Sequence, residues 1–126
     1  MKKENDPVPS GSPVNMDALL DKLAGDQNQL SYFLELFKAG VPELLDILKD
    51  SLKNKDVNNL VNACHGLRGM LLVMEMKQAS SIAIQLEESA SEKNFDGADE
   101  LFHSLEKEIK GAVSSIEKSI DPKNKI

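Results

Sequence analysis

Apolar residues recur at three- and four-residue steps along residues 15–120, with hardly any strict alternation of apolar and polar positions. This is the period of an amphipathic helix, because a helix turns about 100° per residue, whereas a strand repeats every two residues. Short polar turns divide the repeats into one short and four long segments. The pattern therefore predicts an all-α domain, an antiparallel four-helix bundle with a short additional N-terminal helix.

Residues that cap helices stand ahead of the first three repeats. Their side-chain oxygens accept hydrogen bonds from the N–H groups that the first turn of a helix leaves free. Asn15 precedes the short first helix, which Gly25 closes as a C-terminal glycine, and either Asp26 or Asn28 caps the second helix. Asp56 caps the third, so three helix starts are predicted from single residues.

The other boundaries follow from the turns and from one proline. Pro42 lies inside the second helix, where the missing N–H is expected to bend the helix without ending it. The third and fourth helices are expected to meet near residues 74–78. The fifth is expected to begin after Asn94, with Phe95 as its first apolar residue, and to continue to Ile120, about 26 residues or ~39 Å.

Composition indicates a single domain between two tails. A chain of 126 residues has room for one core. Residues 1–14 contain three prolines and are expected to be a flexible tail or linker, residues 15–120 the bundle, and residues 121–126 a C-terminal tail. Hydrophobic residues make up 40% of the chain, which argues against a disordered polymer, and aromatic residues only 4%, which disfavours a β-sandwich.

Charge and cysteine content restrict the partners and the compartment. The net charge is −6, and since the two tails contribute 0 and +1, the bundle carries −7. Such a protein is not expected to bind nucleic acid or to contact an anionic membrane directly. One cysteine excludes an internal disulfide, and no segment predicts a signal peptide or membrane span. We expect a cytoplasmic protein that acts as a monomer.

One segment of the third predicted helix departs from ordinary helix composition. Gly66 and Gly69 lie close together inside it, and each costs roughly 1 kcal/mol relative to alanine. Helical rotation places His65 away from the apolar stripe, on a face that it shares with Asn62 and Gly69. The imidazole is thus left without bulky neighbours. Either another macromolecule approaches it closely, or the glycines merely allow helices to pack and His65 is an ordinary solvated residue.

Arg68 adds a cation to the same face, three residues after His65. It is the only formal charge in residues 57–74, so this part of an acidic chain would tolerate an anion. A neutral imidazole offers a nitrogen lone pair that can attack phosphorus, and a guanidinium binds phosphoryl oxygens through charge-assisted hydrogen bonds. The pair suits reversible phosphoryl transfer to and from nitrogen.

The segment His65-Gly66-Leu67-Arg68-Gly69 resembles the His-x-Leu-Lys-Gly signature of the histidine-containing phosphotransfer (HPt) domain family, which lies on the third helix of a four-helix bundle. The resemblance covers roughly residues 15–118 and includes the helix around Pro42 and the pair Leu86-Glu87. It implies that His65 accepts a phosphoryl group from the aspartate of a response-regulator receiver domain and passes it to another receiver. Arg68 takes the place of the family's usual basic residue.

The resemblance also implies roles for neighbouring residues. Glu87 stands where some members have a glutamine that hydrogen-bonds the ring. A carboxylate there can accept from Nδ1–H and leave Nε2 as the nucleophile, and the alternative is an ordinary solvated glutamate. A receiver-docking surface would comprise Asn62, Gly66, Gly69 and Met70.

Two positions depart from the family pattern. Many members have a glycine ten residues after the histidine, in a left-handed turn that ends the third helix. Here that residue is Glu75, which would cost on the order of 1 kcal/mol in the same conformation. Met70 stands where a small residue is common, and it would either pack inward or contact the partner.

The second histidine and the cysteine have no comparable setting. His103 has no glycine or basic residue at helical spacing and is expected at or near the surface. Cys64 falls at the centre of the apolar stripe and is expected to be a small core residue.

The sequence has no glycine-rich ATP-binding loop and no cluster of metal-binding aspartates. No cofactor of its own is therefore expected, and Mg²⁺ is expected on the partner receiver. The expected partners are receiver domains, with a hybrid sensor histidine kinase as a further candidate. The alternative function is a helical adaptor that binds a receiver or a kinase without phosphotransfer.

Overall fold

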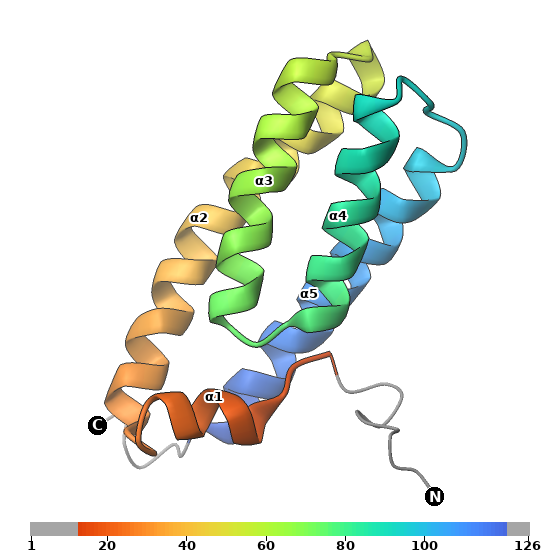
Figure 1. The fold of residues 1–126 in the computed structure, drawn as a ribbon. Helices are drawn as coiled ribbons and strands as arrows, with labels where there is room; N and C mark the ends of the chain where they lie inside the picture. The colour runs from red at the N-terminus through yellow and green to blue at the C-terminus, as the bar shows by residue number, and fades with distance from the viewer. Residues whose placement is uncertain (1–12, 121–126) are drawn as a thin grey trace, which may run out of the picture.

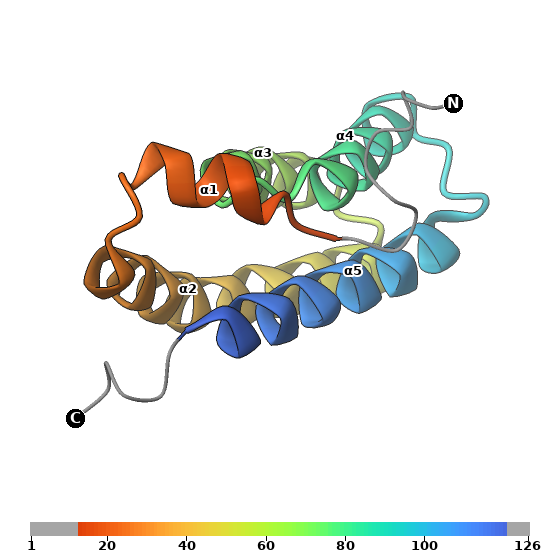
Figure 2. The ribbon, with the colours of Figure 1, turned by 90° about the horizontal axis from the view of Figure 1, so that it is seen from below.

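The computed structural model describes residues 13–120, which form five helices and, within that range, no strand (Figure 1). In chain order these helices are α1 (Met16–Lys22), α2 (Gln27–Asn54), α3 (Val57–Val73), α4 (Lys77–Ser91) and α5 (Ala98–Ser119). The four long helices run side by side with alternating direction, and α2 also packs against α5. The short α1 lies across the end of the bundle at which α3 leads into α4 (Figure 2). The predicted all-α bundle is confirmed.

The core is made by the apolar stripe of each long helix. In α3 the stripe consists of Leu60, Cys64, Leu67 and Leu71, each at most 1% exposed. The facing stripe of α4 contains fully buried alanines at positions 79, 83 and 90. Such small side chains let two helices approach closely, and α3 and α4 form the most extensive helix pair of the bundle. Close packing of this pair also brings the polar edges of the two helices together.

The three predicted helix caps are present. Asn15 Oδ1 accepts a hydrogen bond from the N–H of Ala18 at 3.0 Å. Asp26, rather than Asn28, caps α2, and its Oδ1 accepts from the N–H of Asn28 at 2.9 Å. Asp56 caps α3. Single residues with short polar side chains therefore set these starts, as the sequence indicated.

Helix α5 begins three residues later than expected. The side chain of Asn94 accepts a hydrogen bond from the N–H of Asp96 at 3.1 Å, which stabilises a turn. Gly97 follows with φ +75°, a left-handed conformation that ends this turn immediately before Ala98. Phe95 is therefore outside the helix, although it still packs against the core. The apolar period alone did not reveal this turn.

Glu75 keeps the left-handed turn between α3 and α4 without a glycine, at φ 59°. Its N–H bonds to the carbonyl of Leu72, and the N–H of Met76 bonds to the carbonyl of Leu71 at 2.9 Å. These two bonds satisfy the last carbonyls of α3 in a Schellman arrangement. The left-handed conformation is therefore kept at Glu75, although a side chain with positive φ is costly.

Contacts from the N-terminal segment offset part of that cost. Lys22 Nζ lies 2.8 Å from Glu75 Oε2 and also donates to the carbonyl of Val73 at 2.8 Å. The N–H of Asn15 donates to the carbonyl of Glu75 at 3.0 Å. Helix α1 is therefore attached to the turn that follows α3.

The packed unit begins earlier than residue 15. Val14 is 2% exposed and belongs to the core, and Pro13 packs near Gly111 of α5, where an added Cβ would lie 3.3 Å from Pro13 Cγ. The expected tail is therefore too long by two residues, because an apolar residue next to a cap was assigned to the proline-rich stretch. Residues 1–12 and 121–126, the rest of the two expected tails, lie outside the described residues. Of the helices in residues 13–120, none has the length and hydropathy that crossing a membrane requires.

Candidate functional site

His65 lies in the middle of α3 on the side opposite the buried stripe, and its side chain is 68% exposed. Asn62, Gly66 and Gly69 are exposed beside it. The helical rotation inferred from the sequence is therefore correct. The ring projects from a rigid, interior turn of a helix, which fixes its position more firmly than a loop would.

The two glycines do not serve helix packing. A Cβ built on Gly66 or on Gly69 would have no neighbour within 4 Å. By contrast, a Cβ on Gly40 of α2 would lie 3.1 Å from Cε of Met70. Gly40 therefore makes room for a neighbouring side chain, whereas Gly66 and Gly69 leave open space beside His65. The explanation that this pair of glycines allows helices to approach each other is wrong.

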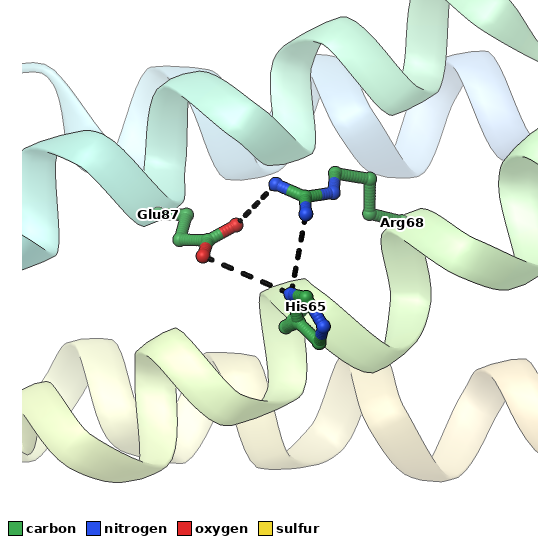
Figure 3. Close-up of polar contacts among 3 residues, drawn as sticks. All are labelled: His65, Arg68 and Glu87. Atoms are coloured by element: carbon green, nitrogen blue, oxygen red, sulfur yellow. Dashed lines mark hydrogen bonds and ion pairs between the residues drawn. The ribbon is translucent and has the colours of Figure 1, made fainter.

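Arg68 connects His65 to Glu87 of α4 (Figure 3). Its Nη1 donates to Glu87 Oε1 at 2.8 Å, and its Nη2 lies 3.2 Å from Nδ1 of His65. The second carboxylate oxygen, Glu87 Oε2, lies 4.0 Å from the same Nδ1. Glu87 is thus not an ordinary solvated glutamate, since it is 21% exposed and paired with Arg68. The direct hydrogen bond from Nδ1–H to the carboxylate is not made at this separation.

Glu87 also changes the charge of the site. The sequence around His65 holds a single cation, but folding places a carboxylate from α4 against it. At neutral pH the two charges compensate each other, so an arriving anion competes with Glu87 for Arg68. This competition was not visible in the sequence, because the two residues are separated by 19 positions.

Cys64, next to His65 in the chain, takes no part in this site. Its side chain is fully buried, as expected of a core residue. Burial raises the pKa of the thiol, the negative charge of Glu87 adds to this increase, and Arg68 acts in the opposite direction, so that the pKa is about 12. The thiol therefore keeps its proton at neutral pH and is no nucleophile.

An apolar groove runs beside the imidazole between α2 and α3. We call it the α2–α3 groove; it measures about 470 Å³, and its lining includes Phe33, Leu36, Phe37, Gly66, Gly69 and Met70. Leu36 is 50% exposed at its edge, and Val73 is 53% exposed. The groove was not predicted. The signal for it was the adjacent pair Leu36-Phe37, because two neighbours on a helix point about 100° apart; here Phe37 is buried and Leu36 is half exposed.

Met70 packs inward, which is the first of the two roles left open for it, and its contact with a partner stays a prediction. Its Cε packs toward Gly40 of α2, and the side chain is partly buried against the core. It also lines the α2–α3 groove. The small residue that allows this packing is Gly40 on the facing helix.

His103 lies on α5, is 76% exposed and has Glu106 Oε1 3.6 Å from its Nδ1. It has no arginine partner of the kind that Arg68 provides for His65. Within residues 13–120, no group of three or more histidine, cysteine, aspartate or glutamate side chains is placed to hold a metal ion.

Comparison with known proteins identifies the family. The family model described as the Hpt domain matches residues 33–117, which include the whole of α3 and α4 and most of α2 and α5. Searches of curated proteins and of solved structures gave no match. The family match covers more than half of the chain, and it includes His65, Arg68 and Glu87. The chain therefore belongs to the Hpt domain family, whose general role is histidine phosphotransfer in phosphorelay signalling.

Proposed function

We propose that His65 is the phospho-accepting residue, and that it takes a phosphoryl group from the aspartate of one receiver domain and gives it to another. The observation that carries this proposal is the exposed imidazole in the middle of α3, with a guanidinium 3.2 Å from its ring and open space over both adjacent glycines. The other histidine, His103, is also exposed, but it has neither a guanidinium beside its ring nor a glycine three or four residues away.

The transfer requires a nucleophilic ring nitrogen and a group that binds the phosphoryl oxygens. Nε2 of His65 attacks phosphorus with its lone pair, and the N–P bond forms as the acyl-phosphate P–O bond breaks. The bonding electrons leave on the carboxylate of the donor aspartate. Arg68 supplies charge-assisted hydrogen bonds to the phosphoryl oxygens. The receiver is expected to bring Mg²⁺, so each partner contributes half of the active site.

The surroundings of His65 suit a docking partner with an apolar face. Gly66, Gly69 and Met70 line the α2–α3 groove on the side of α3. Exposed apolar side chains at its edge, such as Leu36, are typical of protein interaction sites when they form a contiguous patch. A receiver that covers the groove would bring its aspartate over the imidazole, with Asn62 at the margin of the contact.

Transfer of radiolabel from a phosphorylated receiver tests this function. The wild-type protein is expected to acquire acid-labile label, whereas His65→Gln acquires none. The matched control is His103→Gln, which is expected to be labelled like the wild type because the His103 ring lies on α5 and contacts Glu106 rather than Arg68.

Equal labelling of wild type and His65→Gln would overturn the proposal. So would the absence of label on the wild type across the receivers of the same genome. Receiver binding without any label would favour the alternative function, an adaptor that acts without phosphotransfer.

A further inference from the structure

Nδ1 of His65 faces two groups, one of which binds this nitrogen only without its proton and the other only with it. Arg68 Nη2 lies 3.2 Å away and Glu87 Oε2 lies 4.0 Å away (Figure 3). A guanidinium has N–H donors and no acceptor, whereas a carboxylate only accepts. Nδ1 therefore binds Arg68 when it holds a lone pair, and it binds Glu87 when it holds the proton.

The observed contact selects one tautomer of the neutral ring. With Arg68 donating to Nδ1, the single ring proton must be on Nε2. In that tautomer the lone pair at Nε2 belongs to the aromatic system and is not available to attack phosphorus. The outward nitrogen becomes nucleophilic only when the proton is on Nδ1, which Arg68 opposes as long as it remains in place.

We propose that Arg68 is a positioning residue that holds His65 in the unreactive Nε2–H tautomer until an incoming phosphoryl group draws it away. This inference rests on the proposed function of His65. The phosphoryl oxygens compete with Glu87 and Nδ1 for the guanidinium, because they carry more negative charge than either. As Arg68 turns to them, Glu87 loses its partner and is free to accept from Nδ1–H.

The proton and charge balance of this switch is complete. The proton leaves Nε2 and a proton arrives at Nδ1 through water, which has access because the side chain is 68% exposed. Attack by Nε2 then leaves a cationic ring that carries Nδ1–H and the N–P bond. Glu87 faces the cationic ring, while Arg68 faces the phosphoryl group, so the two charges of the resting ion pair each acquire a new partner.

Arginine suits this role better than lysine. Its planar fork presents N–H groups in two fixed directions, here Nη1 toward Glu87 and Nη2 toward His65. A lysine ammonium has no such fixed geometry. Arginine at position 68, in place of the family's usual basic residue, can therefore contact the His65 ring and Glu87 at the same time.

The test is the tautomer of His65, measured from ring ¹⁵N chemical shifts in long-range ¹H–¹⁵N spectra at a pH where imidazole is ordinarily neutral. The wild type is expected to show the Nε2–H form. Arg68→Met removes the donor and keeps the apolar stem, and it is expected to raise the ratio of Nδ1–H to Nε2–H roughly tenfold. In Arg68→Met combined with Glu87→Leu, which also removes the acceptor, the increase is expected to be smaller than in Arg68→Met alone. His103 is the internal control, since its ring has no contact with either residue.

A receiver carrying beryllofluoride, a mimic of the phosphoryl group, tests the release of Arg68. It is expected to shift the wild-type ring toward Nδ1–H. The proposal is overturned if the free wild type already shows Nδ1–H, if Arg68→Met leaves the ratio unchanged in a variant with native helical content, or if the loaded receiver binds without the shift. Label transfer with no tautomer response would refute this switch alone, whereas a tautomer response with no label on His65 would refute the proposed function.

Discussion

Alanine in place of Gly66 or Gly69 is expected to stabilise the bundle, although both glycines belong to the candidate site. Both lie in the interior of α3, and neither has a positive φ. An added Cβ would meet nothing within 4 Å, so no steric term opposes the change. Since glycine costs roughly 1 kcal/mol relative to alanine inside a helix, each substitution should add about 1 kcal/mol to the free energy of unfolding. For a domain of this size that corresponds to a rise in Tm of about 4 °C.

Urea unfolding followed by helical circular dichroism measures this gain. Gly40→Ala is the matched control, because it makes the same change inside α2 but places its Cβ 3.1 Å from Met70 Cε. The control is expected to gain less than either variant of α3. A loss of stability in Gly66→Ala or Gly69→Ala would show that something packs against this face, and the reasoning would fail.

The same variants separate stability from function. The added methyl groups occupy the space through which a receiver would reach His65. The free energy of unfolding of the double variant is therefore expected to be about 2 kcal/mol higher than that of the wild type. The double variant is also expected to accept label from the receiver on the order of tenfold more slowly. Unchanged transfer in a stabilised double variant would mean that the glycines do not belong to the docking surface.

The remaining predictions concern the turns that follow α3 and α4 and the buried thiol of Cys64. Lys93 follows α4 with φ 58°, and Lys93→Gly should raise the free energy of unfolding by about 1 kcal/mol in the same urea assay. Glu75→Gly should raise the free energy of unfolding by less than Lys93→Gly does, since it also removes the ion-pair partner of Lys22. Equal increases in the two variants would contradict this reasoning. Cys64 should resist a thiol reagent at pH 8 in the folded protein and react after unfolding, because burial raises its pKa to about 12; rapid modification of the folded protein would contradict this. Since the unfolded thiol ionises near its ordinary pKa of 9.0, the contribution of Cys64 to stability is complete below pH 9 and is lost as the pH rises toward 12. Between pH 9 and pH 12 the free energy of unfolding should therefore fall less in Cys64→Ala than in the wild type.

Most of the fold was predictable because the sequence features that mark a helix lie within a few residues of one another. The apolar period is a property of neighbouring residues, and caps such as Asp26 act within three positions of themselves. The errors arose where a local feature had two interpretations. Phe95 continued the apolar period but belongs to a turn made by Asn94 and Gly97. Val14 adjoined prolines but belongs to the core.

The candidate site also has one part that follows from local sequence and one part that depends on tertiary packing. His65 and Arg68 are three residues apart on one helix, so their proximity follows from helical geometry alone. The position of Glu87 relative to Arg68 depends on how α3 and α4 pack, which no local pattern determines. Resemblance to the family indicated Glu87, but it did not indicate that the ion pair with Arg68 would take precedence over the ring.

Helix α3 must satisfy opposite requirements on its two faces. Leu60, Leu67 and Leu71 are at most 1% exposed, and burying a leucine side chain stabilises a protein by roughly 1.5–3 kcal/mol. Together they outweigh the approximately 2 kcal/mol that Gly66 and Gly69 cost. A segment of this length with two interior glycines would have no such compensation in isolation, because short helices are marginal in water. The open surface around the imidazole therefore depends on tertiary packing: the outer face of α3 can be made of glycines because the inner face is made of leucines.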